Sequence, residues 1–325
     1  MGKTGKISFN PSSLLLLLAA FIWGTAFVSQ SVGMDYIQPL TFSCLRNFIG
    51  VAVLIPAALI RRSRARKSPD YHPMTRADWK LTLRAGFASG AVLAVASTLQ
   101  QYGIAMTTVG KAGFLTALYI VLVPVLGVFI GRKPGRLVVL SVAIAVAGLY
   151  FLCMTAGSFH MEAADLILIA CAFSFAVQIL VIDRYADRVD SVLLALFEFL
   201  FCGLLLLVPM FAAEHPTMTQ VASAWLPLLY AGGLSSGVAY TLQIAGQKGT
   251  DPTIASLLMS LESVFSALSG FFILHQVLSG RELIGCALMF AAIIITQMPQ
   301  KKAAAPLEAA DPESPSQPSS DSSAF

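Results

Sequence analysis

Three charged side chains lie near the middle of long apolar runs of the sequence, where an unpaired charge is costly. They are Glu262, Arg46 and Glu198. A charged residue at the centre of a membrane-spanning helix costs roughly 2.5–3.5 kcal/mol on insertion scales, so it faces a cavity, meets a partner or is neutralised. Glu262 is therefore a candidate for binding a cationic or amine group, or for carrying a proton. The structural alternative is an ion pair or a hydrogen bond.

Arg46 and Glu198 fall in the second and the seventh apolar run, which correspond in the two halves of the chain described below. Ionisable residues inside a membrane usually pair with one another. We therefore expect these two residues to form a structural or gating ion pair rather than to bind substrate.

Aromatic and amide side chains supply the other groups that can bind a small molecule. Trp23 and Phe27 are four residues apart and share one helical face, where they can form the apolar wall of a cavity. The structural alternatives are an interfacial position for the tryptophan and hydrogen bonds between helices for the amides. The remaining residues that we expect to bind substrate are Gln100, Tyr119, Gln178 and Gln243.

Motifs that indicate an enzyme are either absent or lack the secondary structure that their chemistry requires. Residues 233–237, Gly-Leu-Ser-Ser-Gly, match the G-x-S-x-G pattern of a nucleophilic serine, but they lie inside an apolar run with no strand before it. No HExxH, CxxC or Walker A pattern occurs, and the five cysteines are scattered singly in apolar runs. We expect no catalytic residue, no metal and no cofactor.

The composition indicates an integral membrane protein. Of the 325 residues, 57% are hydrophobic and 12% are charged, and the mean hydropathy is +0.77. A soluble globular chain carries about 25% charged residues. The basic residues flank apolar segments, so the net charge of +4 does not indicate a nucleic-acid partner. The expected partners are a lipid bilayer and a small-molecule metabolite.

Ten apolar runs recur along the chain, each long enough to cross a hydrocarbon core of about 30 Å. Runs this long and continuous exclude the alternating segments of a membrane barrel. The sequence therefore predicts an all-α integral membrane protein with ten transmembrane helices. The predicted spans are 13–32, 37–60, 81–104, 111–131, 136–154, 163–182, 189–211, 222–246, 253–274 and 281–298.

Lysine and arginine set the expected orientation, because cytoplasmic loops carry an excess of them. With the N-terminus in the cytoplasm, eighteen of the twenty-one basic residues lie on the cytoplasmic side. We expect a short cytoplasmic N-terminus, 1–12. The cytoplasmic tail, 299–325, is rich in Pro, Ser and acidic residues, cannot bury a core and is expected to be disordered.

The chain contains an internal duplication. Residues 99–131 and 242–274 align without a gap, and eleven of the thirty-three pairs are identical. We expect one five-helix repeat in 13–155 and a second in 160–298. Because five is odd, the second copy enters the membrane from the other side, so the two repeats are inverted. Transporters built in this way bind substrate near the membrane midplane, at the repeat interface.

Small residues at three-, four- and seven-residue steps mark one face of each aligned segment. Small side chains let helix backbones approach closely in a membrane. We therefore expect the helices of 111–131 and 253–274 to cross at this face. The expected helix-crossing residues are Gly113, Ala117, Gly127, Ser256, Ser260 and Gly270.

Five short motifs accompany this organisation. They are residues 21–28 (Phe-Ile-Trp-Gly-Thr-Ala-Phe-Val), 39–46 (Pro-x-x-Phe-x-x-x-Arg), 99–103 (Leu-Gln-Gln-Tyr-Gly), 110–119 (Gly-Lys-Ala-Gly-Phe-Leu-Thr-Ala-Leu-Tyr) and 260–262 (Ser-Leu-Glu). Together they resemble the drug/metabolite transporter superfamily, in its ten-helix EamA-type exporter branch, although Ser263 stands where that family usually has proline. The resemblance implies a secondary transporter that moves small metabolites without ATP, often outward, in a bacterial inner membrane or other cell membrane.

The sequence thus predicts a secondary active transporter or facilitator that exports small amphipathic metabolites by alternating access. Amino acids, related compounds and drugs fit a cavity of rings and amides with one carboxylate. Proton coupling through Glu262 is a hypothesis. A non-transporting structural or receptor protein is the alternative, and it would not need matched polar positions in two repeats. A membrane-embedded enzyme would need convergent catalytic groups, which the sequence does not offer.

Overall fold

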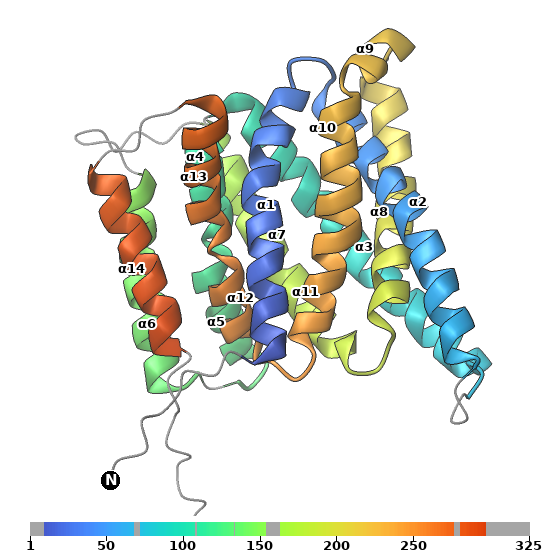
Figure 1. Cartoon of the computed structure of the whole chain (residues 1–325), viewed down its shortest axis with the longest axis horizontal. Helices are drawn as coiled ribbons and strands as arrows, with labels where there is room; N and C mark the ends of the chain where they lie inside the picture. Colours follow the sequence, from blue (N-terminus) through green and yellow to red (C-terminus); the bar gives the residue numbers. More distant parts are fainter. Residues whose placement is uncertain are drawn as a thin grey trace, which may run out of the picture.

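The computed structural model describes residues 10–67, 72–107, 109–132, 134–153, 163–275 and 280–296, and these residues form helices and connecting turns with no strand. The helices stand side by side in one bundle (Figure 1). Most of the predicted N-terminal segment 1–12 and all of the predicted tail 299–325 lie outside the described residues.

The helices follow one another with short connections. The first half contains α1 (Pro11–Gly33), α2 (Pro39–Ala65), α3 (Arg76–Met106), α4 (Val109–Ala117), α5 (Tyr119–Phe129) and α6 (Arg136–Cys153). The second half contains α7 (Ala163–Ala186), α8 (Ser191–Ala213), α9 (Met218–Ser223), α10 (Trp225–Leu229), the π-helix η1 (Tyr230–Ala239), α11 (Tyr240–Gln247), α12 (Pro252–Met259), α13 (Glu262–Leu274) and α14 (Gly280–Thr296).

Seven helical stretches among the described residues are long and apolar enough to cross a membrane. Two of them are composite, because α4 with α5 and α12 with α13 each form one stretch. The apolar parts of α6 and α14 are shorter, and α10, η1 and α11 form a continuous run from 225 to 247. Each of the ten predicted ranges is mostly helical where it is described, with turns or breaks inside several of them. A multi-pass, all-helical membrane protein is confirmed, and the number of ten membrane-spanning helices stays a prediction.

Side-chain caps explain where several helices begin. Asn10 and Asp251 cap α1 and α12, and in both cases proline opens the helix. Helix α2 also opens with proline, but its cap residue Gln38 makes no such bond. Instead, the Glu214 carboxylate at the end of α8 accepts hydrogen bonds of 2.8 and 2.6 Å from the backbone N–H groups of residues 40 and 41. These bonds tie the start of α2 to the turn between α8 and α9.

Two of the membrane-spanning stretches are broken near their middle. The first is interrupted at Leu118, between α4 and α5, and the second at Ser260 and Leu261, between α12 and α13. Helix α4 packs on α13 and α5 packs on α12, so the two stretches lie antiparallel, half against half. Tyr119 and Glu262, which pair in the sequence alignment, are the first residues of the half-helices that follow the breaks.

Of the predicted helix-crossing residues, Gly113 lies at this contact and Gly127 does not, and the crossing at the other four stays a prediction. The Ser263 hydroxyl of α13 donates a hydrogen bond of 3.4 Å to the Gly113 carbonyl of α4, so the backbones are close there. Ser256 and Ser260 are buried but donate to carbonyl groups of their own helix. Gly127 lies apart, because a Cβ added to it would meet only an arginine side chain of the following loop.

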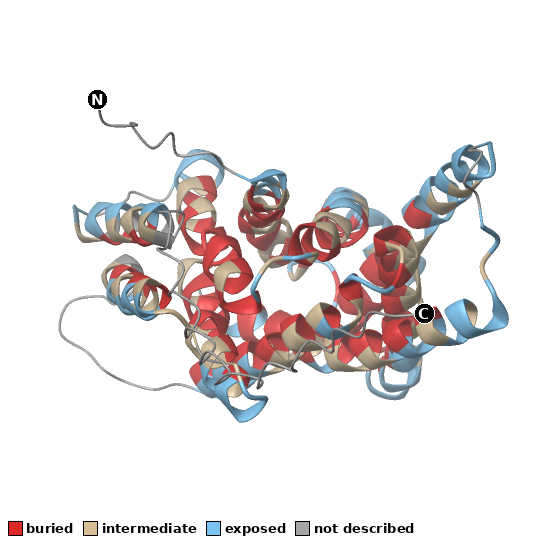
Figure 2. Ribbon diagram, turned by 90° about the horizontal axis from the view of Figure 1, so that it is seen from below, coloured by how far each residue is buried: buried red, intermediate tan, exposed pale blue. Residues whose placement is uncertain are grey.

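Glycine also brings α1 close to α13. A Cβ added to Gly24 would lie 2.3 Å from the Phe265 Cβ and 2.7 Å from the Glu262 carbonyl oxygen. The two helices can therefore approach this closely only because residue 24 has no side chain. Buried residues face such contacts inside the bundle, and exposed residues lie on its outer faces (Figure 2). The contact places Gly24 beside Glu262, the first residue after the break in the second stretch.

Candidate functional site

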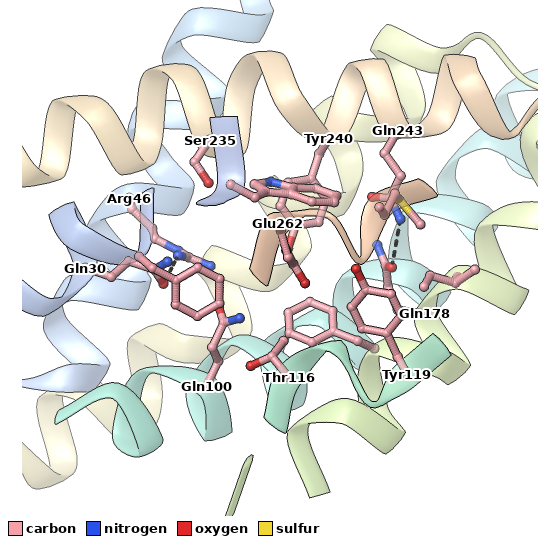
Figure 3. A pocket seen from close by; sticks show the side chains of 15 residues that line it. Gln30, Arg46, Gln100, Thr116, Tyr119, Gln178, Ser235, Tyr240, Gln243 and Glu262 are labelled. Carbon is pink, nitrogen blue, oxygen red and sulfur yellow. Dashed lines mark hydrogen bonds between the residues drawn. The ribbon is translucent and has the colours of Figure 1, made fainter. Parts of the chain in front are cut away.

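A cavity lies inside the bundle, where the two broken stretches meet α1, α2, α3, α7 and the run of η1 and α11 (Figure 3). The cavity is constricted, because its volume is only about 30 Å³. The lining residues are Trp23, Phe27, Gln30, Arg46, Gln100, Thr116, Tyr119, Phe175, Gln178, Ile179, Ser235, Tyr240, Gln243, Met259 and Glu262. All seven residues that the sequence predicts as substrate-binding are in this set.

Aromatic side chains form one wall of the cavity. The ring of Trp23 packs on that of Tyr240 with 4.8 Å between centroids and an interplanar angle of 66°. Tyr240 also packs edge-on against Phe199 of α8, with 5.1 Å between centroids. Phe27 lies one turn after Trp23 on α1 and is fully buried. These ring contacts hold the wall in one arrangement.

The two helix breaks bring a hydroxyl group and a carboxylate to the cavity. Tyr119 and Glu262 are 3% and 4% exposed, and each follows a break directly. Thr116 lies one turn before Tyr119, and Figure 3 shows its side chain turned to the same space as Glu262. The Tyr119 hydroxyl interacts with the Glu262 carboxylate, and the Thr116 hydroxyl interacts with the Cys171 thiol. None of Tyr119 Oη, Thr116 Oγ1 and Glu262 Oε1 forms a hydrogen bond of ordinary geometry with a described residue.

Other buried polar atoms of the lining also lack partners within the described residues. They are the donors Trp23 Nε1 and Arg46 Nε and the acceptor Gln243 Oε1. Buried polar groups in proteins are nearly always hydrogen-bonded, so a cluster of unpaired ones indicates that water or a ligand completes it. The cavity presents donors and acceptors together and therefore fits a molecule that carries both.

The amides of the cavity belong to a chain of hydrogen bonds. Gln243 Nε2 donates to Gln178 Oε1 at 3.3 Å, and Gln178 Nε2 donates to Glu198 Oε1 at 2.9 Å. The first of these bonds is marked in Figure 3. Gln178 and Gln243 therefore face the cavity and at the same time hold α7, α8 and α11 together.

Arg46 and Glu198 do not pair with each other, contrary to our expectation. Arg46 Nη1 donates to Gln30 Oε1 at 2.7 Å, and Glu198 accepts from Gln178. No ion pair joins the two charges among the described residues. Each is nearly fully buried, and each turns toward a glutamine on a different helix, Arg46 toward α1 and Glu198 toward α7. Arg46 consequently lines the cavity, whereas Glu198 supports it from behind Gln178.

Several lining residues were not among the predicted site residues. Thr116, Phe175, Tyr240 and Met259 each precede a predicted site residue by three positions, which places the two members of a pair on one face of a regular helix. Phe175 and Tyr240 share such a face with Gln178 and Gln243, whereas a helix break separates the other two pairs. That spacing was a usable signal in the sequence. Ser235 belongs to the rejected G-x-S-x-G segment and reaches the cavity from η1 (Figure 3). No group of three or more His, Cys, Asp or Glu among the described residues could hold a metal ion.

Comparisons with known proteins agree with this architecture. The model of the EamA-like transporter family matches residues 10–154 and again residues 162–298. An uncharacterized transporter of Archaeoglobus fulgidus is 27% identical over 289 residues, which are 88% of this chain and 86% of that protein. The uncharacterized transporter YwfM of Bacillus subtilis is 24% identical over 302 residues, 90% of this chain and 96% of that protein.

Among solved structures, a crystal structure of another protein has a similar fold. It superimposes with a TM-score of 0.70 at 21% sequence identity and covers 88% of this chain and 96% of that one. A likeness at this level of identity shows a common fold.

Proposed function

Because the chain belongs to the EamA-like transporter family, we propose that it exports small amphipathic metabolites by alternating access, as a secondary transporter or facilitator. The observation that carries this proposal is the buried cavity with unpaired donors and acceptors. Its rings, amides and two charged groups suit a molecule with an apolar body and polar ends. The proposed location is the inner or plasma membrane.

The proposed transport unit consists of two inverted repeats of five membrane-spanning helices, with both termini in the cytoplasm. The family model matches the chain twice in succession, and the two broken stretches pack antiparallel, half against half. Substrate would lie at the repeat interface, and rocking of one repeat against the other would open the cavity to either side. The constriction of the cavity fits an occluded state between two such openings.

The charges of the lining favour a zwitterion such as an amino acid. Among the described lining residues, Arg46 is the cation and Glu262 is the carboxylate, and each has an atom without a hydrogen-bond partner. Hydrogen bonds between ionised groups are stronger than neutral ones. A substrate carboxylate would therefore bind Arg46, its ammonium group would bind Glu262, and its side chain would contact Trp23 and Phe27.

Thermal-shift binding measurements with phenylalanine, its methyl ester and its N-acetyl derivative test the substrate assignment. The wild-type protein should be stabilised most by phenylalanine. Arg46→Gln should no longer distinguish the acid from the ester, and Glu262→Gln should no longer distinguish the free from the acetylated amine. A hydrogen bond to a charged group contributes about 1.5–3 kcal/mol, which is about 10- to 100-fold in affinity.

The matched control is Asp187→Asn, which removes an exposed carboxylate outside the cavity and should leave all three affinities unchanged. Undiminished discrimination in both cavity variants would refute the zwitterion assignment.

Flux measurements in proteoliposomes test transport itself. Reconstituted protein should move labelled phenylalanine across the bilayer, and protein-free liposomes should not. Binding without any flux would favour a receptor or structural protein. Glu262→Gln tests proton coupling, which we infer from the buried, incompletely bonded carboxylate. This variant should lose uptake driven by an imposed pH gradient, and unchanged gradient-driven uptake would rule the coupling out.

A further inference from the structure

A cluster of basic and aromatic side chains lies on the outer surface, at the start of α3 and away from the central cavity. A shallow, open groove is formed there by α3 and α8. Its basic rim consists of Arg76, Lys80 and Arg84, which are four residues apart and so follow one face of α3. All three residues are exposed.

The floor of the groove is apolar and largely aromatic. Leu83 and Phe87 of α3 are 40% and 52% exposed. Phe201 of α8 packs edge-on against Phe87, with 5.5 Å between ring centroids. Trp79 lies at the basic end, where the Arg62 guanidinium group from the end of α2 is 5.1 Å from the centre of its ring. The groove thus joins a cationic end to an apolar trough.

The positive charge of the basic rim is not neutralised within the described part of the chain. None of its three residues forms an ion pair with a described residue. The nearest acid along the chain, Asp78, accepts hydrogen bonds from the backbone N–H and the hydroxyl of Thr75 in the cap of α3. The basic rim therefore complements an anion that comes from outside the chain.

The position of the groove along α3 decides which kind of anion fits. Helix α3 is one of the stretches able to cross the membrane, the basic rim occupies its first turns, and the apolar floor continues along it. A phospholipid presents a phosphate at the membrane surface and acyl chains directly below it. Free phosphate would leave the apolar floor uncovered.

We propose that the α3–α8 groove binds an anionic phospholipid. Its phosphate lies among Arg76, Lys80 and Arg84, and one acyl chain lies along Leu83, Phe87 and Phe201. This assignment depends on the membrane location of the chain and is independent of the proposed transport activity. Basic pockets at the ends of membrane-spanning helices are a recurrent site for anionic lipid headgroups.

Native mass spectrometry of the whole protein, titrated with phosphatidylglycerol or phosphatidylcholine, tests the proposal. The triple variant Arg76→Gln, Lys80→Gln, Arg84→Gln should bind phosphatidylglycerol about 100-fold more weakly, because each basic residue near an anionic surface contributes about fivefold. The control triple variant Arg64→Gln, Arg66→Gln, Lys67→Gln removes the same charge from exposed positions outside the groove and should retain the tight site. The proposal would be overturned if both triple variants lost the same affinity, or if all three proteins bound phosphatidylglycerol equally. It would also be overturned if the wild type bound the two lipids with equal affinity.

Two further experiments distinguish a site for lipid from a site for small anions. Glycerol phosphate added in excess should not displace phosphatidylglycerol, and efficient displacement would indicate a headgroup-only site. In proteoliposomes, a variant that retains Trp79 as its one tryptophan (Trp23→Phe, Trp225→Phe) should be quenched by brominated phosphatidylglycerol at a lower mole fraction than by brominated phosphatidylcholine. Identical quenching by the two lipids would contradict a preference for anionic lipid at this groove.

Discussion

Alanine substitutions at the adjacent residues Gly232 and Gly233 of η1 should have opposite outcomes. A Cβ added to Gly232 would lie 2.5 Å from the Ile49 Cβ and 2.8 Å from the Arg46 carbonyl oxygen, whereas one added to Gly233 would meet nothing within 4 Å. Carbon atoms pack at about 3.5–4.0 Å. Helix α2 and η1 would therefore have to separate by about 1 Å to accept alanine at residue 232.

The magnitude follows from two opposing effects. Overpacking of a close contact costs about 1–3 kcal/mol. Replacing glycine with alanine inside a helix gains roughly 0.5–1 kcal/mol in backbone entropy, and both variants share this gain. The free energy of unfolding of Gly232→Ala should therefore be about 1–3 kcal/mol below that of Gly233→Ala. Arg46 lies on the turn of α2 that would be displaced, so Gly232→Ala should also weaken ligand binding in the cavity.

The assay is reversible unfolding in mixed micelles titrated with SDS, followed by far-UV circular dichroism for the wild type and both variants. Thermal-shift measurements of phenylalanine binding report the ligand affinity of the same samples. Unfolding free energies of the two variants that agree within about 0.5 kcal/mol, the usual effect of an unconstrained substitution, would refute the close packing of α2 on η1.

Three further substitutions test other contacts. Gly24→Ala should destabilise the protein by about 1–3 kcal/mol in the same assay, because its Cβ would overlap the Phe265 Cβ of α13; a melting curve like that of the wild type would contradict the close α1–α13 contact. Glu214→Gln should cost about 1–3 kcal/mol and lower the melting temperature without changing ligand affinity, because an N–H group at the start of α2 loses its acceptor. Lys111 and Asp165 form an ion pair of 2.8 Å in which the aspartate is only 5% exposed, so a double-mutant cycle of Lys111→Gln and Asp165→Asn should show a coupling energy between the two residues; a cycle with no coupling would exclude this.

Much of the fold and of the candidate site could be predicted from the order of residue types. Long apolar runs predict helices because a chain in lipid must satisfy its backbone polar groups internally. The run predicted for 163–182 became α7, Ala163–Ala186, with polar residues extending it at the end. Polar residues in such runs, among them Gln100, Gln178 and Glu262, are costly unless they face an interior, and all three line the cavity.

The tertiary structure alone decided where the helices break and which polar groups meet. Charge attraction predicts that Arg46 and Glu198 pair, yet each contacts a glutamine instead. Side chains leave a helix at about 100° per residue, so a partner depends on how each helix is rotated against its neighbours. That rotation results from close contacts between distant segments, such as Gly24 against α13, and local sequence patterns do not encode it. The packing of distant segments also creates the groove beside α3. Its floor brings Phe87 together with Phe201, which lies 114 positions later in the sequence.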